Sequence, residues 1–386
     1  MLKDAFVFLL FFSASLDAAA IKRGPYVEDF TQKSAVISFR TFPATFTWLT
    51  YGAYPDCERF ATFSGFDTEH KIRLNGLLED TTHCYRIYLP VDLSTYSYKA
   101  FEGYFRTFRE EKNEILSFLV LGASNNDPEE QKKLADSMLK IEDSEFAVHT
   151  GNIVKSGLDK DADEEYFSLY KNLIKRIPVY ISLGERDFGP NFNNKDGSGF
   201  LKENFTPYRS WPRNGMGPHY YFFDQAHARF IILDSNAFAG GLYSPALKKD
   251  SKQYIWLENV LKTDTHKWKF VVIHNPLYSS SFPVIAEEKE VLTPMFETYG
   301  VDMVFQYGGG GYERFKAIRE DEEDESGVTY VSLGWGQEDK KEENPLTDIF
   351  LSGNYFAHIK IEGLKLEMKI YDSSGAVKDV FVLEKK

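Results

Sequence analysis

The sequence predicts an all-β sandwich followed by a layered α/β domain, and three observations support this prediction. The chain has 386 residues, 43% of them hydrophobic, which is enough apolar material for two cores of unequal size. Residues 21–110 consist of short runs rich in Val, Ile, Phe, Thr and Tyr, separated by turn residues. Residues 111–386 alternate apolar strands with helical stretches, as layered α/β domains do.

The first domain is expected to be a small antiparallel sandwich without helices. Its strands are predicted at Ser34–Thr41, Phe46–Tyr51, His70–Leu74, His83–Leu89 and Glu102–Phe108. In the second domain, apolar runs of four to six residues predict buried strands, whereas longer stretches with helical periodicity predict helices. The predicted strands are Leu116–Leu121, Phe146–His149, Val179–Leu183, Tyr220–Phe223, Phe230–Asp234, Lys269–His274 and Met303–Tyr307, with more strands after Thr329. The predicted helices are Glu129–Ile141, Glu164–Arg176 and Ser251–Leu261.

Residues 1–20 have the layout of a cleavable secretory signal. Lys3 precedes an apolar run from Ala5 to Phe12, and small residues end at Ala20, so the mature chain is expected to start at Ile21. The alternative is a buried strand or a short anchor helix, but eight apolar residues fall short of the roughly 20 that span a bilayer. We therefore expect an extracellular or periplasmic protein that makes no stable membrane insertion.

Charge and cysteine content narrow the possible partners. Lys and Arg total 45 against 58 Asp and Glu, a net charge of -13 that disfavours a nucleic-acid partner. The acidic run Glu320–Glu325 is expected to be a solvated loop, with cation binding as the less favoured alternative.

Cys57 and Cys84 form either a disulfide or two separate thiols. Asn204 fits a glycosylation acceptor pattern.

Five predicted strands end in conspicuous loops, where function collects in α/β sheets. The loops begin at Gly122, Gly151, Gly184, His274 and Tyr307. Their order and spacing resemble the calcineurin-like metallophosphoesterases, and within them the purple acid phosphatases. The resemblance extends to Arg23–Tyr26, Tyr220–Asp224, Phe230–Asp234, Gln253–Leu257, Asp372–Gly375 and Asp379.

This resemblance implies a metallophosphoesterase-type β-sandwich flanked by helices over residues 111–386, after a fibronectin type III-like domain over residues 21–110. Family members hydrolyse phosphate esters with two metal ions. Where the family places metal ligands, this chain has Ala123, Asn152, Lys155, Glu185, His274, Gly308 and Gly310, and Arg186 stands at the position of the catalytic His.

The substituted positions imply a degenerate site. Methyl, ammonium and hydrogen groups cannot bind a cation, so only Asn152, Glu185 and His274 remain as conceivable donors. The resemblance therefore implies no resident cofactor, or at most one divalent metal. Arg186 stays protonated and cannot cycle a proton. Asp127, four residues after Ala123, is a carboxylate displaced along the loop from the expected ligand position. Glu313 and Arg314 are expected to form an ion pair.

Several readings of this pattern stay open. The favoured one is a catalytically degenerate, purple-acid-phosphatase-like protein with a binding or scaffold role and an unidentified protein partner. The second is a divergent phosphoesterase that hydrolyses phosphate monoesters with one weakly held metal. The third is a protein-binding module acting through the fibronectin-like domain.

A further possibility concerns ligands of the degenerate site itself. Lys155 and Arg186, with the backbone amides of Gly308, Gly309 and Gly310, are candidates for binding a small phosphate-type anion without metal. The alternative is that these glycines only fill the space of lost histidines and form a flexible loop.

Overall fold

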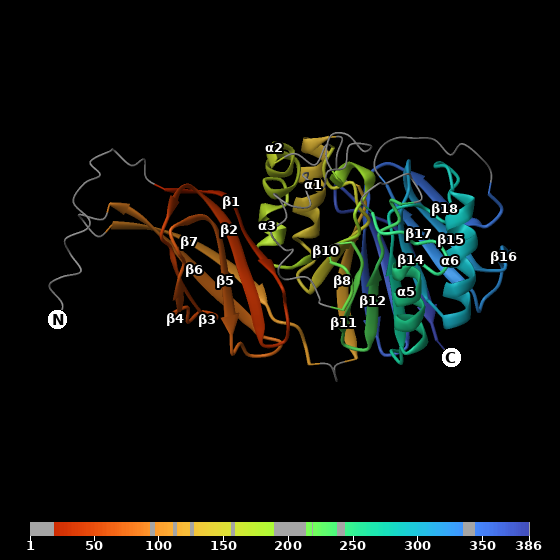
Figure 1. The fold of residues 1–386 in the computed structure, drawn as a ribbon, viewed down its shortest axis with the longest axis horizontal. Coiled ribbons are helices and arrows are strands. Elements are labelled where there is room, and N and C mark those ends of the chain that lie inside the picture. The colour runs from red at the N-terminus through yellow and green to blue at the C-terminus, as the bar shows by residue number, and fades with distance from the viewer. Residues whose placement is uncertain are drawn as a thin grey trace.

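The computed structural model describes residues 19–92, 97–110, 114–123, 127–155, 159–188, 214–217, 219–237, 244–334 and 344–385. Figure 1 shows a smaller all-β domain beside a larger domain of strands and helices. Most of the predicted signal sequence and Asn204 lie outside the described residues. Within them, no helix has the length and apolar character needed to cross a membrane.

The N-terminal domain consists of two antiparallel sheets packed face to face. One sheet has the order β1 (Ala20–Glu28), β2 (Ser34–Thr45) and β5 (Asp67–Asn75). The other has the order β4 (Arg59–Phe63), β3 (Trp48–Ala53), β6 (Thr82–Asp92) and β7 (Ser97–Arg106). Alternate residues such as Ile37, Leu49 and Ile87 are fully buried between the sheets, as the period-2 pattern predicts. The all-β prediction is confirmed.

A disulfide joins Cys57 to Cys84 in this domain, with their Cα atoms 5.6 Å apart. Both residues are buried. The bridge ties the segment between β3 and β4 to β6, and it settles the choice that the sequence left open.

The larger domain contains two mixed sheets. The first has the order β10 (Val179–Ile181), β9 (Phe146–His149), β8 (Ile115–Leu121), β19 (Tyr355–Glu362), β20 (Lys365–Asp372) and β21 (Val377–Glu384). The second has the order β11 (Tyr221–Gln225), β12 (Ala228–Ile232), β13 (Trp268–Val272), β14 (Met303–Tyr307), β17 (Val328–Leu333), β15 (Gly311–Arg319) and β16 (Glu322–Glu323), and β18 (Thr347–Ser352) also pairs with β15. Aromatic side chains such as Phe118, Phe146, Phe230 and Phe270 pack in the core that these sheets share.

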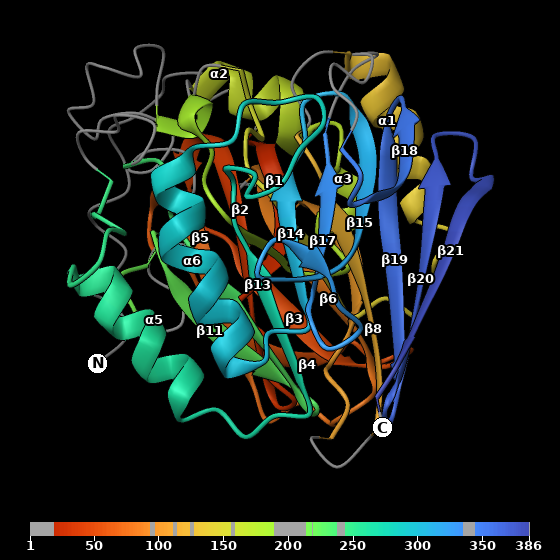
Figure 2. The same cartoon turned by 90° about the vertical axis from the view of Figure 1, so that its right-hand side faces the viewer.

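Helices cover the outer face of each sheet. They are α1 (Pro128–Met138), α2 (Asp159–Asp161), the π-helix η1 (Ala162–Phe167), α3 (Lys171–Ile174), the 3-10 helix η2 (Glu185–Phe188), α5 (Lys252–Lys262) and α6 (Ala286–Tyr299). Residues of α1, η1 and α3 pack on β8 and β9 in one core cluster, and residues of α5 and α6 pack on β12, β13 and β14 in another. Figure 2 shows α5 and α6 in front of the second sheet. The layered β-sandwich flanked by helices is thus confirmed.

Two sequence predictions about helices need correction or refinement. The helix expected at Glu164–Arg176 is interrupted, because η1 is wound as a π-helix and α3 begins only at Lys171. Asp127, considered as a displaced carboxylate, is the N-cap of α1, where its side chain accepts the N–H groups of Glu129 and Glu130.

The two domains contact each other through polar and aromatic side chains. The guanidinium of Arg23 on β1 pairs with Asp163 of η1 at 2.5 Å and lies over the ring of Phe167. Tyr26 packs on the same ring at 5.1 Å. Because Arg23 is almost fully buried, this contact fixes the edge of β1 against the larger domain.

Candidate functional site

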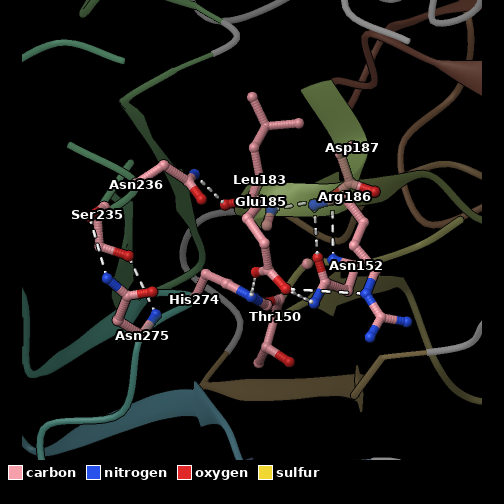
Figure 3. A network of polar contacts seen from close by, with 12 residues as sticks. Thr150, Asn152, Leu183, Glu185, Arg186, Asp187, Ser235, Asn236, His274 and Asn275 are labelled. Carbon is pink, nitrogen blue, oxygen red and sulfur yellow. Dashed lines mark hydrogen bonds and ion pairs between the residues drawn. The ribbon is translucent and has the colours of Figure 1, made fainter. Parts of the chain in front are cut away.

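The loops after β9, β10 and β13 meet at the carboxyl ends of these strands, where the sequence placed the candidate site. Figure 3 shows that Asn152, Glu185, Arg186 and His274 converge there from loops far apart in the chain. In one sheet β9 pairs parallel with β10, and in the other β13 pairs parallel with β12 and with β14, so the carboxyl ends are aligned within each sheet. The fold therefore brings together the three residues proposed as remaining metal donors.

Gly151 and Asn152 form a tight turn after β9. Gly151 has φ +97° and Asn152 has φ +54°, and a Cβ on Gly151 would lie 2.6 Å from the backbone nitrogen of Gly184. Glycine is therefore required where the two loops touch. The amide of Asn152 spans the junction: its Nδ2 donates to Glu185 Oε1 at 2.9 Å, and its Oδ1 accepts the N–H of Arg186 at 3.0 Å.

His274 follows β13 and contacts two oxygen acceptors. Its Nδ1 lies 2.6 Å from the carbonyl oxygen of Thr150, and its Nε2 lies 2.6 Å from Oε2 of Glu185. Neither a carbonyl nor a carboxylate donates a proton, so both ring nitrogens must carry one. The contacts therefore describe an imidazolium paired with a carboxylate, beneath the stacked ring of Tyr307 at 5.0 Å.

Burial and charge act in opposite directions on this pair. Burial opposes the charged form of His274, but the Glu185 carboxylate outweighs it and raises the pKa of His274 above its usual value. Burial alone would raise the pKa of Glu185. The charge of His274 and its hydrogen bond outweigh burial and lower the Glu185 pKa to about 2. Each charge of the pair therefore favours the charged form of the other group.

Asp187 joins the same two loops through hydrogen bonds to its carboxylate, a role that the sequence analysis missed. Its fully buried carboxylate accepts the N–H groups of Asn152 and Gly184, each at 2.9 Å. It also accepts from Ile153 at 2.9 Å and Val154 at 3.4 Å. Burial raises the pKa of Asp187 to about 6, although these N–H groups favour the charged form. An Asp three residues after a loop glycine was the only signal in the sequence.

His149, at the end of β9, lies close behind the pair. Its Nδ1 accepts the N–H of Gly151 at 3.0 Å, which places its proton on Nε2. Burial, and then the neighbouring charge of His274, lower the pKa of His149 to about 3. His149 is therefore neutral, and among the described residues its Nε2 has no hydrogen-bond partner.

The two cations proposed for anion binding each contact a carboxylate. The Nζ of Lys155 lies 2.8 Å from Glu165 Oε1 and 3.9 Å from Asp161 Oδ1, and the side chain is largely exposed. The Nε of Arg186 lies 3.8 Å from Glu185 Oε1. Anion binding at these residues stays a prediction.

Apart from Lys155, the other positions at which the resemblance implies ligands are filled by buried Ala and Gly residues. Ala123 is buried in the core cluster beneath α1. Gly308, Gly309 and Gly310 are also buried. A Cβ on Gly308 would lie 2.6 Å from the Cβ of Ser332, so an imidazole at this position requires the backbone to move.

The expected ion pair between Glu313 and Arg314 is wrong, because neighbouring residues of a strand point to opposite faces. Glu313 accepts hydrogen bonds from the Ser280 and Thr347 hydroxyls. Arg314 pairs instead with Asp348 and Asp379, and its guanidinium lies over the ring of Phe381.

A second set of polar residues, not identified from the sequence, supports the loops after β10 and β13. Asn236 Nδ2 donates to the carbonyl of Leu183, and Asn275 Nδ2 donates to the carbonyl of Ser235 (Figure 3). Asn275 Nδ2 also lies 2.8 Å from Oε2 of Glu288, a buried residue of α6. These bonds connect the segments on either side of His274.

The distance between the donor atoms of Glu185 and His274 shows whether these residues, as placed, could share a metal ion. An ion held by both Glu185 and His274 would keep Oε2 and Nε2 roughly 3 Å or more apart and would need an unprotonated nitrogen. The atoms lie 2.6 Å apart with a proton between them. Among the described residues, no group of three or more His, Cys, Asp or Glu is arranged to hold a metal. The residues as placed do not fit the two-metal centre.

Comparison with known proteins agrees with the fold. Residues 118–306 match the family model of the calcineurin-like phosphoesterases. Probable purple acid phosphatase 20 of Arabidopsis thaliana is 32% identical over 30% of this chain and 27% of its own length. Purple acid phosphatase 13 of the same plant is 27% identical over 51% of this chain and 36% of its own length. For purple acid phosphatase 4 the identity is 24%, over 67% of this chain and 81% of that protein.

Solved structures show the same fold at low sequence identity. A purple acid phosphatase from yellow lupin seeds aligns with a TM-score of 0.73 at 14% identity, covering 95% of this chain and 74% of that one. GAP50 of Plasmodium aligns with a TM-score of 0.53 at 19% identity, covering 70% and 89%. The chain spans only about a quarter to a third of the first relatives, so their activities do not transfer by similarity alone. The family match and the shared fold together identify residues 118–306 as a calcineurin-like phosphoesterase domain, similar to that of the purple acid phosphatases.

Proposed function

We propose that this chain is a secreted pseudoenzyme: a purple-acid-phosphatase-like scaffold that binds a partner and does not turn over phosphate esters. The hydrogen-bond network of Asn152, Glu185 and His274 carries the proposal. Each of these side chains already uses its donor or acceptor atoms on another protein group. The side-chain nitrogen and oxygen atoms that would bind a metal are therefore engaged in these hydrogen bonds.

The remaining positions support the same reading. Phosphate monoester hydrolysis is among the slowest spontaneous reactions and needs very large accelerations. Arg186, at the position of the family's catalytic His, cannot donate and recover a proton at physiological pH. The buried Gly308 leaves no room for a metal-binding imidazole without backbone movement.

A structural neighbour supports a non-catalytic use of the fold. GAP50 is described as the anchor in the inner membrane complex of Plasmodium. It shares only 19% identity with this chain, so it is a precedent for the fold rather than for a partner.

A divergent phosphoesterase is the second candidate, and one observation favours it. Asn152, Glu185 and His274 converge on one point, as a single-metal site would require. In this case Asn152, Glu185 and an unprotonated His274 Nε2 would hold a divalent ion, which would supply Lewis-acid polarisation of a phosphoryl oxygen.

The test is a combined measurement of metal content and turnover. The protein is purified from a secreting host without chelator, its metals are measured by inductively coupled plasma mass spectrometry, and p-nitrophenyl phosphate hydrolysis is followed from acid to alkaline pH with added Zn²⁺, Mn²⁺ or Fe²⁺. The pseudoenzyme predicts substoichiometric metal and the same background rate for the wild type and for His274→Ala. Stoichiometric metal with turnover that disappears in His274→Ala would establish the enzyme instead.

A matched variant guards against a trace phosphatase contaminant. Arg186→Gln leaves Asn152, Glu185 and His274 in place. A rate that persists in Arg186→Gln and also in His274→Ala therefore belongs to a contaminant. Recovery of the leader-free chain from the culture medium, with its N-terminus defined by mass spectrometry, tests secretion separately.

A further inference from the structure

The C-terminal strand β21 forms one edge of the six-stranded sheet. Among the described strands it pairs only with β20, and Figure 2 shows it at the outer side of this sheet. An edge strand presents every second N–H and C=O without a strand partner, and proteins usually cover such an edge or interrupt it with charged residues or proline. β21 is therefore a position at which another strand can extend the sheet.

The backbone of β21 shows which of its groups face the open edge. The N–H of Lys385 donates to the carbonyl oxygen of Leu364, directly before β20, at 2.9 Å. Backbone groups of consecutive residues in an antiparallel ladder alternate in direction. The N–H and C=O groups of Val380, Val382 and Glu384 therefore point away from β20, to the side where a further strand would lie.

The side chains of β21 are unusually apolar for an open edge. Val377, Val380 and Val382 are 46%, 50% and 47% exposed, and no other described strand exposes as many large apolar side chains. Phe381 and Leu383 alternate with the last two valines and pack against the core. β21 thus combines outward-facing backbone groups with exposed valines, and this combination favours strand pairing between proteins.

Two opposite charges flank the valines symmetrically. Lys378 and Glu384 lie three residues before and after Phe381, and Val380 and Val382 lie one residue before and after it. The side chain of Lys378 is 41% exposed. Glu384 is also exposed, and no described cation forms an ion pair with it. The strand is therefore complementary to itself when a second copy runs antiparallel to it.

We propose that β21 is a self-association edge, which pairs antiparallel with β21 of a second copy about a two-fold axis beside Phe381. Val380 then lies opposite Val382 of the second copy, and Lys378 lies opposite Glu384 of the second copy. The two-fold axis makes each of these contacts twice. Apolar side chains and opposite charges at facing positions both stabilise an antiparallel pair. The six-stranded sheets of the two copies become one continuous sheet.

The register follows from the direction of the backbone groups and from the charges. A shift by one residue would place outward-facing groups of one copy opposite inward-facing groups of the other. A shift by two residues would place Val380 opposite Glu384, or Val382 opposite Lys378, and so a valine against a charge. Of these registers, the symmetric one alone matches every outward-facing side chain, which favours a second copy over an unrelated strand. The inference does not depend on the proposed loss of catalysis.

Analytical ultracentrifugation of the full chain, as processed by a secreting host, tests the pairing. The wild type is expected to show a monomer–dimer equilibrium in the micromolar range. Lys378→Glu and Glu384→Lys each place two like-charged pairs in the interface, so each should weaken the association about tenfold. The combined variant Lys378→Glu with Glu384→Lys exchanges the charges and should restore the wild-type dissociation constant.

Recovery in the combined variant is specific to pairing between copies. Lys378 and Glu384 are about 20 Å apart along one strand, so they cannot compensate each other within a copy. Lys378→Glu also loses an ion pair with Asp372, whose Oδ2 lies 2.8 Å from the Nζ of Lys378. Glu384→Lys leaves this pair intact, so it separates weaker association from a weaker β20–β21 hairpin.

A backbone variant tests the edge independently of charge. Val382→Pro removes an N–H that points away from β20, and an edge strand tolerates proline at such a position. It should abolish the dimer, whereas Lys360→Glu on β19, two strands from the edge, should leave the dimer unchanged. Circular dichroism confirms that the variants fold.

Three outcomes overturn the inference. The first is a wild type that stays monomeric, and the second is a dimer that Val382→Pro leaves intact, because such a dimer uses another surface. The third is a combined charge variant that associates no more tightly than the two single variants, because Lys378 and Glu384 then do not face each other across the interface.

Discussion

The imidazole of His274 and the carboxylate of Glu185 form a direct ion pair, with Nε2 and Oε2 2.6 Å apart. By the sequence resemblance, both residues stand at positions where metal ligands are expected. A proton thus lies between two groups that the resemblance predicted as metal donors. The charge of that proton is the simplest substitute for part of the missing metal charge.

Removal of His274 should destabilise the protein, because Glu185 then keeps a charge without its partner. Breaking a buried pair costs about 3–5 kcal/mol, and the partial exposure of Glu185 reduces this to about 2–3 kcal/mol for His274→Ala. Guanidinium unfolding measures the change. The double variant His274→Leu with Glu185→Leu, which removes both charges, should recover most of the loss. Equal instability of the double variant would show that packing, and not charge, dominates.

The contribution of this pair to the free energy of unfolding should be largest in mildly acidic solution. The Glu185 pKa is lowered to about 2, so its contribution is complete above its usual pKa of 4.5 and is lost as pH falls toward 2. The His274 pKa is raised, so its contribution is complete below its usual pKa of 6.5 and is lost as pH rises through the raised value. Unfolding free energies of wild type and His274→Ala should differ most between about pH 4.5 and 6.5. A constant difference across pH contradicts the pairing.

His149 should make the protein sensitive to acid. Its pKa is lowered to about 3, so between pH 6.5 and 3 the unfolded chain binds a proton that the folded chain does not. Stability should then fall by about 1.4 kcal/mol for each pH unit below 6.5 from this residue alone. In His149→Gln, whose amide oxygen can still accept the N–H of Gly151, the slope should be shallower in this window. An unchanged slope assigns the acid sensitivity to other groups.

The sequence predicted most of the strands and the locations of the site loops because both depend on local patterns, but β1 and β4 were missed. The strand expected at Leu116–Leu121 is β8 to within one residue, and the turn at Gly151 lies where the loop glycines placed it. The helix α6 was missed, because it contains Pro294 and its N-cap, Ile285, offers no capping side chain.

The orientation of the site residues could not be predicted. Glu185 and His274 are 89 residues apart, and their identities suit a metal site as well as an ion pair. Which of the two forms depends on side-chain geometry after the loops pack. Lys155 illustrates the same point, since the nearby Glu165 that pairs with it carries no family motif.

Asp187 should be the most sensitive residue of the loop junction. Its carboxylate accepts the N–H groups of four residues in two loops, and Asp187→Ala leaves these buried donors without their partner. Unsatisfied buried donors cost about 1–3 kcal/mol each, so we expect a loss of several kcal/mol or failure to fold. Asp136, exposed on α1, provides the control: Asp136→Ala should change stability by less than about 0.5 kcal/mol. Hydrogen exchange of Ile153 should accelerate in Asp187→Asn, a milder variant, and unchanged exchange contradicts the role.

The disulfide should contribute stability to the N-terminal domain without affecting the site. Cys57 and Cys84 are 27 residues apart, and closing a loop of this length in the unfolded chain stabilises the folded state by about 3–4 kcal/mol. The double variant Cys57→Ala with Cys84→Ala should therefore unfold at lower denaturant, and added reductant should bring the wild type to the same midpoint. The effect of His274→Ala should be the same with and without the bridge, because the two features lie in different domains. A reductant effect that persists in the double variant would mean that the bridge is not what the reductant removes.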